Sequence, residues 1–159
     1  MRITSKMGGA LLATGIGMAM AGSAVPAAAN SDLQTAENLR KLDIMLMVTS
    51  LRCRTGADDF QKDYQKFSAT HLATLNAAGR QLRTELQKKH GTKGAMRALD
   101  KMSVGMANEY GNGHPWLECA QLKRMTRSLT AERNPDQLAI AADEVLRPRA
   151  SGRRLAMLD

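Results

Sequence analysis

Apolar positions recur at intervals of three and four residues through most of the chain, the spacing that places them on one face of an α-helix. The first such face consists of Leu39, Leu42, Leu46 and Thr49, and it leads to Cys53. Residues 44–48 are apolar on every side, so the middle of this helix is predicted to be enclosed by other helices. Ser31 and Gln34 have capping-box spacing, which predicts a start at Ser31, and Gly56 is the predicted end.

A second and longer apolar face follows the acidic pair at 58 and 59. Its members are Phe60, Tyr64, Phe67, His71, Leu75, Ala78, Leu82 and Leu86. At 1.5 Å per residue an unbroken helix of this length would extend about 50 Å. Gly79 is the predicted place for a bend, and Gly91 is the predicted end of the helix.

Three further helices are predicted after Gly91. The first covers residues 92–110, and its inner face consists of Ala95, Leu99, Met102, Met106 and Tyr110. Pro115 suits the first position of a fourth helix, which carries Trp116, Cys119, Leu122 and Met125. Asn134 and Pro135 repeat a cap-then-proline signal before a short last helix, and Pro148 ends that helix.

No segment shows the alternation of apolar and polar residues that is typical of a β-strand. The sequence therefore predicts an all-α protein, a compact bundle of four to five helices. There is no internal repeat and no linker that would divide the helical part, so residues 30–148 are predicted to form one domain. Residues 149–159 contain three arginines with Ser151 and Gly152, and they are predicted to be a basic, mobile tail.

The segment 1–29 has the pattern of a cleavable secretory signal peptide. Arg2 and Lys6 precede a long uncharged run, and small residues at 27–29 suit cleavage before Asn30. An uncleaved membrane anchor is the alternative, but the uncharged run is shorter than the ~20 apolar residues that a bilayer crossing needs. The segment 1–29 is therefore predicted to be removed, and the protein is predicted to be periplasmic or secreted. No later segment is long and apolar enough to span a membrane.

Removal of Arg2 and Lys6 with the signal peptide lowers the formal net charge from +8 to +6, because all 15 acidic residues remain. A moderately basic surface suits an anionic envelope component, such as lipid headgroups or a cell-wall polymer, or an envelope protein. Aromatic side chains, on which single-stranded nucleic acid stacks, make up only 3% of the chain. Nucleic acid is therefore not the expected partner.

Both cysteines, Cys53 and Cys119, lie in the part that remains after cleavage. An even number of cysteines in an oxidising compartment predicts a disulfide, which would join the first predicted helix to the fourth. On the chain-entropy account, closing a loop of this length stabilises the fold by roughly 4 kcal/mol. The alternative is a reactive thiolate at Cys53, activated by its neighbours Arg52 and Arg54.

The segment 110–119 gathers several residue types that can carry chemistry. Tyr110, His114 and Trp116 are candidates for the rim of a ligand site, and His114 with Glu118 is a candidate acid–base pair. This pair would suit a small hydrolase or transferase. The same residues also suit a corner between two helices, in which Trp116 fills the core.

His71 lies on the apolar face of the second predicted helix, and it is a candidate axial ligand for haem or a metal. The Cys-x-x-Cys-His motif of covalent haem attachment is absent. A buried histidine that is satisfied by a hydrogen bond is the alternative. The methionines of the mature chain could ligate Cu(I), but they follow the helical spacing of packing residues. No cofactor is therefore expected.

Two runs of sequence, 39–54 and 113–119, carry a family resemblance: LRKLDIMLMVTSLRCR and GHPWLEC. They resemble a small family of uncharacterised exported helical proteins of Gram-negative bacteria, some of which carry the name S-adenosyl-L-homocysteine hydrolase. Such a hydrolase needs a nicotinamide-binding Rossmann domain with a parallel sheet and a complete glycine fingerprint. The part of the chain after the signal peptide is too short for such a domain pair and has neither feature, so that enzymatic name does not fit.

These features together favour an exported, non-enzymatic helical protein that binds a partner or associates with the envelope. A small hydrolase or transferase that uses His114 and Glu118 is the first alternative. A haem- or copper-binding bundle that uses His71 is the second.

Overall fold

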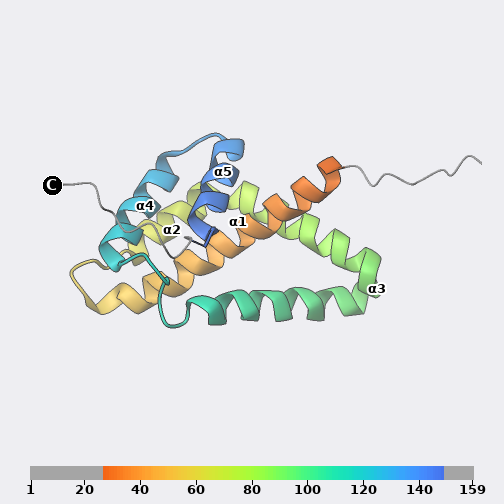
Figure 1. The fold of residues 1–159 in the computed structure, drawn as a ribbon, viewed down its shortest axis with the longest axis horizontal. Coiled ribbons are helices and arrows are strands. Elements are labelled where there is room, and N and C mark those ends of the chain that lie inside the picture. The colour runs from red at the N-terminus through yellow and green to blue at the C-terminus, as the bar shows by residue number, and fades with distance from the viewer. Residues whose placement is uncertain (1–26, 149–159) are drawn as a thin grey trace, which may run out of the picture.

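The computed structural model describes residues 27–148, which consist of helices and their connections (Figure 1). The elements are α1 (Ala27–Arg52), the short 3-10 helix η1 (Cys53–Thr55), α2 (Gln61–Thr70), α3 (Leu72–Tyr110), α4 (Cys119–Ala131) and α5 (Pro135–Leu146). No β-strand occurs in this range, so the predicted all-α bundle is confirmed. The expected signal peptide up to residue 26 and the expected tail 149–159 lie outside the described residues.

Helix α1 runs through the middle of the molecule, where it packs against α3 and α5, while α2 packs against α4 (Figure 1). Leu42, Met45 and Leu46 are fully buried, as the continuous apolar stretch predicts. The enclosure of this stretch is not complete, because Met47 keeps 38% of its surface exposed. The remaining α1 side chains of the core are Ala36, Leu39 and, half-buried, Leu33 and Val48.

Gly91 divides α3 into two helical arms, residues 72–90 and 92–110. Its backbone has φ +66° and ψ 173°, a left-handed conformation that glycine adopts without the steric cost of a Cβ atom. The second arm consequently turns back along the molecule (Figure 1). The predicted end of the helix at Gly91 is therefore confirmed. The structure adds that the chain reverses its direction sharply at this residue.

The long second helix of the sequence analysis is broken at His71, and the predicted bend at Gly79 is wrong. Gly79 lies inside the first arm of α3 with helical neighbours on both sides. His71 has φ −102° and ψ 12°, outside the helical region, and it separates α2 from α3. The imidazole of His71 is hydrogen-bonded to the carbonyl oxygen of Leu129 in α4, so the break coincides with a contact between distant segments.

Helix α4 begins at Cys119, so the predicted start at Pro115 is wrong. Glu118 is its N-cap residue and forms a capping box with Gln121, whose Oε1 accepts a 2.9 Å hydrogen bond from the backbone N–H of Glu118. Residues 111–118 thus form a loop rather than the first turn of a helix.

The cap signals in the sequence predicted the start of α5 correctly but not the start of α1. Asn134 caps α5 as predicted, because its Oδ1 accepts a hydrogen bond from the N–H of Asp136 at 2.8 Å, with Pro135 at the first position. Helix α1 already begins at Ala27, before Ser31, since the alanines at 27–29 are strong helix formers.

Across the described residues, no helix has both the length and the apolar character that crossing a bilayer requires.

Candidate functional site

The predicted disulfide between Cys53 and Cys119 is present, with Cα atoms 5.8 Å apart. It fastens η1, at the end of α1, to the first residue of α4 and holds the loop 111–118 between them. We call residues 51–55 together with 110–119 the disulfide corner. No described cysteine is free, so the alternative of a reactive thiolate at Cys53 is wrong.

The three predicted rim residues meet in the disulfide corner and pack against one another. The rings of Tyr110 and His114 stack with centroids 5.6 Å apart, and Trp116 meets His114 edge-on at 4.7 Å. The backbone N–H of Trp116 donates to Nδ1 of His114 at 3.4 Å. Tyr110 is 2% exposed and His114 is 9% exposed. Tyr110 and His114 are therefore buried in the corner between α3 and α4, whereas Trp116 is half-buried and does not fill the core.

His114 and Glu118 both line a small pocket of about 190 Å³ beside the disulfide. Glu118 is exposed, and its carboxylate accepts from the backbone N–H of Gln121 in the capping box of α4. The residues proposed from sequence as an acid–base pair thus share a pocket, and one of them serves as a helix cap.

Arg52 lines both this small pocket and a larger one. It lies over Gly113, whose φ is +104° and where a Cβ atom would come within 3.2 Å of Nε of Arg52. Glycine at 113 therefore allows both the left-handed turn and the close approach of the guanidinium group.

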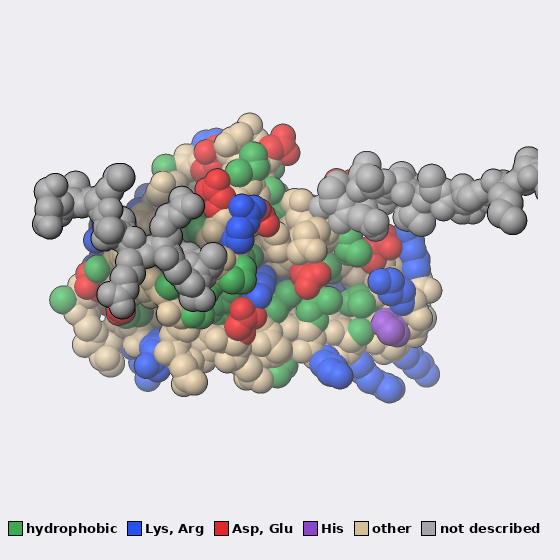
Figure 2. Space-filling model, in the orientation of Figure 1, with side chains coloured by type: hydrophobic (Ala, Val, Ile, Leu, Met, Phe, Trp, Pro, Cys, Tyr) green, Lys and Arg blue, Asp and Glu red, His purple; other side chains and the backbone are tan. Residues whose placement is uncertain are grey.

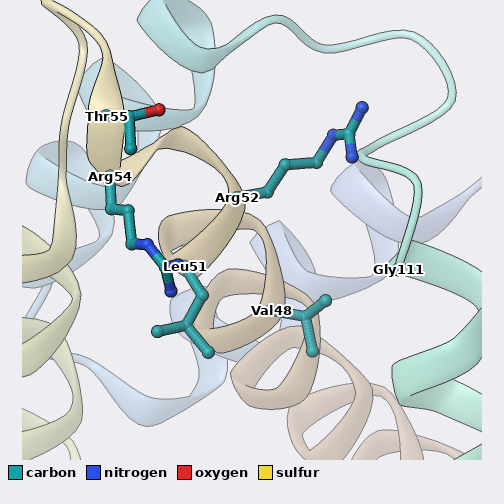
Figure 3. Close-up of a pocket in the computed structure, with 6 residues that line it drawn as sticks. All are labelled: Val48, Leu51, Arg52, Arg54, Thr55 and Gly111. Atoms are coloured by element: carbon teal, nitrogen blue, oxygen red, sulfur yellow. The ribbon is translucent and has the colours of Figure 1, made fainter.

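The larger pocket has a volume of about 420 Å³ and is lined by Val48, Leu51, Arg52, Arg54, Thr55 and Gly111 (Figure 3). Arg52 extends toward the loop that carries Gly111, and Arg54 reaches alongside Leu51. Leu51 keeps 46% of its surface exposed. The sequence contained one signal for this pocket, namely the arginines on either side of Cys53. From the sequence alone, these arginines were interpreted only as groups that could activate the cysteine.

His71, the candidate haem or metal ligand, is 7% exposed and contacts α4. Its Nε2 lies 2.8 Å from the carbonyl oxygen of Leu129, and because that oxygen can only accept, Nε2–H is the donor. Its ring also packs against Phe67 with centroids 4.9 Å apart. Residues 27–148 contain no group of three or more His, Cys, Asp or Glu side chains arranged to hold a metal ion.

The methionines that could have formed a soft-metal site are distributed through the core and the surface. Met45 and Met106 are buried, and Met102 and Met125 pack half-buried against the core. Met47 and Met96 are exposed. The buried ones act as packing residues, for which their flexible side chains are suited.

A polar cluster between α1, α2 and α3 was not expected from the sequence. The hydroxyl of Tyr64 donates to Oδ1 of Asp43 at 3.1 Å, and Nη2 of Arg40 donates to the hydroxyl of Ser103 at 3.2 Å. Burial raises the pKa of Asp43 above its ordinary value, while the Tyr64 hydrogen bond and the charge of Arg40 oppose that rise. Burial and the charge of Asp43 together raise the pKa of Tyr64 to about 12.

The reversal at Gly91 brings together basic residues from both arms of α3. We call residues 80–101 the basic end; it contains seven Lys or Arg residues and two acidic residues. All seven are exposed, and one of the acids, Glu85, is paired with Lys88 at 2.6 Å. Figure 2 shows Lys and Arg side chains gathered where α3 reverses. The seven are Arg80, Arg83, Lys88, Lys89, Lys93, Arg97 and Lys101.

Comparison of the chain with protein-family models, with curated proteins and with solved structures finds no significant match.

Proposed function

We propose that this chain is an exported, non-enzymatic helical protein that binds an anionic component of the bacterial envelope through the basic end of α3. The observation that carries the proposal is the concentration of charge in residues 80–101. Outside this segment, the rest of 27–148 contains eleven Lys or Arg residues and twelve Asp or Glu residues. The excess positive charge of the helical domain thus belongs to the two stretches of α3 that meet at the Gly91 reversal.

Clustered, exposed cations favour a broad anionic surface over a small ligand. Each Lys or Arg close to an anionic membrane contributes about 1 kcal/mol of attraction. Because Glu85 is already paired with Lys88 and Asp100 is the other acid of the segment, little negative charge opposes that attraction. The exposed side chains of Met96 and Val104 on the second arm add apolar surface beside the cations.

Three observations support export as part of this proposal. A disulfide such as Cys53–Cys119 persists in oxidising compartments, among them the periplasm. The segment 1–29 has the signal-peptide pattern described above. The resemblance of runs 39–54 and 113–119 to exported helical proteins of Gram-negative bacteria points to the same location.

Anionic lipid headgroups are the component with which we test the proposal. The mature protein, beginning at Asn30, is mixed with vesicles of phosphatidylcholine alone or with phosphatidylglycerol, and the bound fraction is measured by co-sedimentation. We expect binding only to the anionic vesicles. That binding should decrease with added salt, which screens exposed charges over a Debye length of about 10 Å at 0.1 M.

The variant K89Q/K93Q/R97Q/K101Q removes four charges from the basic end and should weaken vesicle binding at least tenfold, given about 1 kcal/mol per residue. The control variant K62Q/K66Q/R124Q/R133Q removes four exposed charges elsewhere and should bind within about twofold of the parent protein. Equal losses in both variants, or no binding by the parent protein, would overturn the proposal.

A further inference from the structure

We propose that the larger pocket of the disulfide corner binds a small amphiphilic oxyanion, a carboxylate or phosphate group carried on a short aliphatic chain. This site is separate from the basic end. It concerns a soluble small ligand, whereas the proposed function concerns an extended anionic surface.

The charge of the pocket is positive and uncompensated among the described residues. Arg52 and Arg54 both line it, and no acidic side chain of residues 27–148 does. Neither arginine forms an ion pair with another described residue. The guanidinium group presents a fork of N–H donors that matches the two oxygens of a carboxylate or phosphate. Two such groups beside one pocket therefore favour an oxyanion.

The rest of the lining suits an aliphatic chain attached to that head group. Val48 and Leu51 lie three residues apart on α1, so their side chains are neighbours on one face. Both line the pocket, and half-exposed Leu51 provides apolar surface that a ligand could cover. The hydroxyl of Thr55 adds a further donor. The pocket is open to solvent, and its volume of about 420 Å³ is sufficient for a short aliphatic chain.

The disulfide fixes the stretch of backbone that carries the two arginines. Arg52 and Arg54 flank Cys53, which is bonded to Cys119 of α4. Arg52 is also confined by the turn at Gly113 beneath its guanidinium group. A backbone that is already fixed before the ligand arrives loses less conformational entropy on binding. If Arg52 acted only as a favourable charge at the carboxyl end of α1, that role would require neither the disulfide nor the close turn at Gly113.

The pocket lies at one end of the second arm of α3, and the Gly91 reversal, about which the basic end is centred, lies at the other. Gly111 lines the pocket, and the arm 92–110 separates it from Gly91. At 1.5 Å per residue this arm is about 28 Å long. Variants at one site should therefore leave the other intact, which allows the two proposals to fail independently.

The test uses three probes with the mature, oxidised protein: inorganic phosphate, hexyl phosphate and hexanoate. Amide chemical shifts are followed during titration, and the affected residues are expected to be those around Leu51, Arg54 and Gly111. The pocket is open, so we expect Kd values of about 1 mM for the two alkyl probes. Inorganic phosphate should bind at least tenfold more weakly than hexyl phosphate, because it cannot cover Val48 and Leu51.

The variant R52Q/R54Q should weaken hexyl phosphate binding at least tenfold, since both charged donors are lost. The control R124Q/R133Q removes two exposed arginines outside the pocket and should bind like the parent protein. The variant L51S should bring hexyl phosphate close to inorganic phosphate. R52Q/R54Q should also bind anionic vesicles like the parent protein. A failure of the pocket proposal can therefore be distinguished from a failure of the proposed function of the basic end.

Binding of either alkyl probe supports the site, and the stronger of the two identifies the head group. If the parent protein binds neither alkyl probe, or if R124Q/R133Q loses as much affinity as R52Q/R54Q, the proposal is overturned. A circular dichroism unfolding curve for each variant verifies that the comparison is made between folded proteins. Because Arg52 and Arg54 are exposed, their replacement is expected to leave the fold intact.

Discussion

The hydroxyl of Tyr64 donates a hydrogen bond to Oδ1 of Asp43 at 3.1 Å, and this contact ties α2 to α1. Both side chains are half-buried, and burial is the main cause that raises the pKa of each. The charge of Asp43 raises the pKa of Tyr64 further, since a second negative charge beside the carboxylate is unfavourable. The pair therefore makes stability depend on pH at both the acid and the alkaline end.

Replacement of Asp43 by Asn is expected to stabilise the protein at neutral pH. Because folding raises the pKa of Asp43, its favourable contribution is complete below the ordinary value of 3.8 and is lost as pH rises through the folded-state pKa. The amide oxygen of Asn can still accept from Tyr64 and carries no charge. Urea unfolding at neutral and acid pH measures the difference, which should shrink in acid. A variant less stable than the parent at neutral pH would contradict this.

Tyr64 is expected to ionise with a pKa of about 12 in the folded protein, above the ordinary value of 10. Its contribution to stability is complete below pH 10 and is lost as pH rises through about 12. The chain has two tyrosines, so phenolate absorbance is followed in the Y110F background. Adding D43N should lower the Tyr64 pKa toward 10, because a negative neighbour is removed. An unchanged titration in Y110F/D43N would show that Asp43 has no influence.

His71→Ala is expected to destabilise the protein by about 2–3 kcal/mol, through the loss of a buried hydrogen bond and of ring packing. The bond in question joins Nε2 of His71 to the carbonyl of Leu129, and the ring packs on Phe67. Exposed His90→Ala is the matched control and should change stability by less than about 0.5 kcal/mol. Equal effects of the two variants in denaturant unfolding would argue against a structural role for His71.

The double variant C53S/C119S is expected to lose roughly 4 kcal/mol of stability, since the bond closes a loop between residues 66 positions apart. Reduction of the parent protein should have a similar effect in urea unfolding. Each treatment should also weaken hexyl phosphate binding, because the backbone that carries Arg52 and Arg54 would no longer be tied to α4. If reduction left the unfolding midpoint unchanged, the disulfide would contribute nothing to the folded state.

Two glycines offer a matched pair of substitutions with opposite expected signs. Gly113→Ala should destabilise by about 1–2 kcal/mol, because φ is +104° and the new Cβ would crowd Arg52. Gly79→Ala should stabilise by about 0.5–1 kcal/mol, since Gly79 is helical and a Cβ there meets no atom within 4 Å. Only Gly113→Ala should weaken oxyanion binding. Thermal unfolding measures the changes in stability, and titration with hexyl phosphate measures the change in binding.

The sequence was sufficient for the features that depend on local periodicity and on residue chemistry. Spacings of three and four placed Leu42 and Leu46 in the core, and Asn134 with Pro135 predicted the start of α5. The pairing of Cys53 with Cys119 followed because only two cysteines remain after the predicted cleavage. The reversal at Gly91 was predicted as a helix end because glycine readily leaves the helical conformation.

Contacts between distant segments decided what the sequence could not. The helix break lies at His71 and not at Gly79, and the imidazole there binds a carbonyl 58 positions away, which a local pattern does not reveal. The pKa of Asp43 depends on its burial and on its hydrogen bond to Tyr64, and the local sequence pattern reveals neither. Likewise, the reversal at Gly91 brings basic residues of both arms together, and the fold places Arg52 and Arg54 at one pocket with Gly111. Periodicity specifies which face of a helix is apolar, but only packing determines which faces meet.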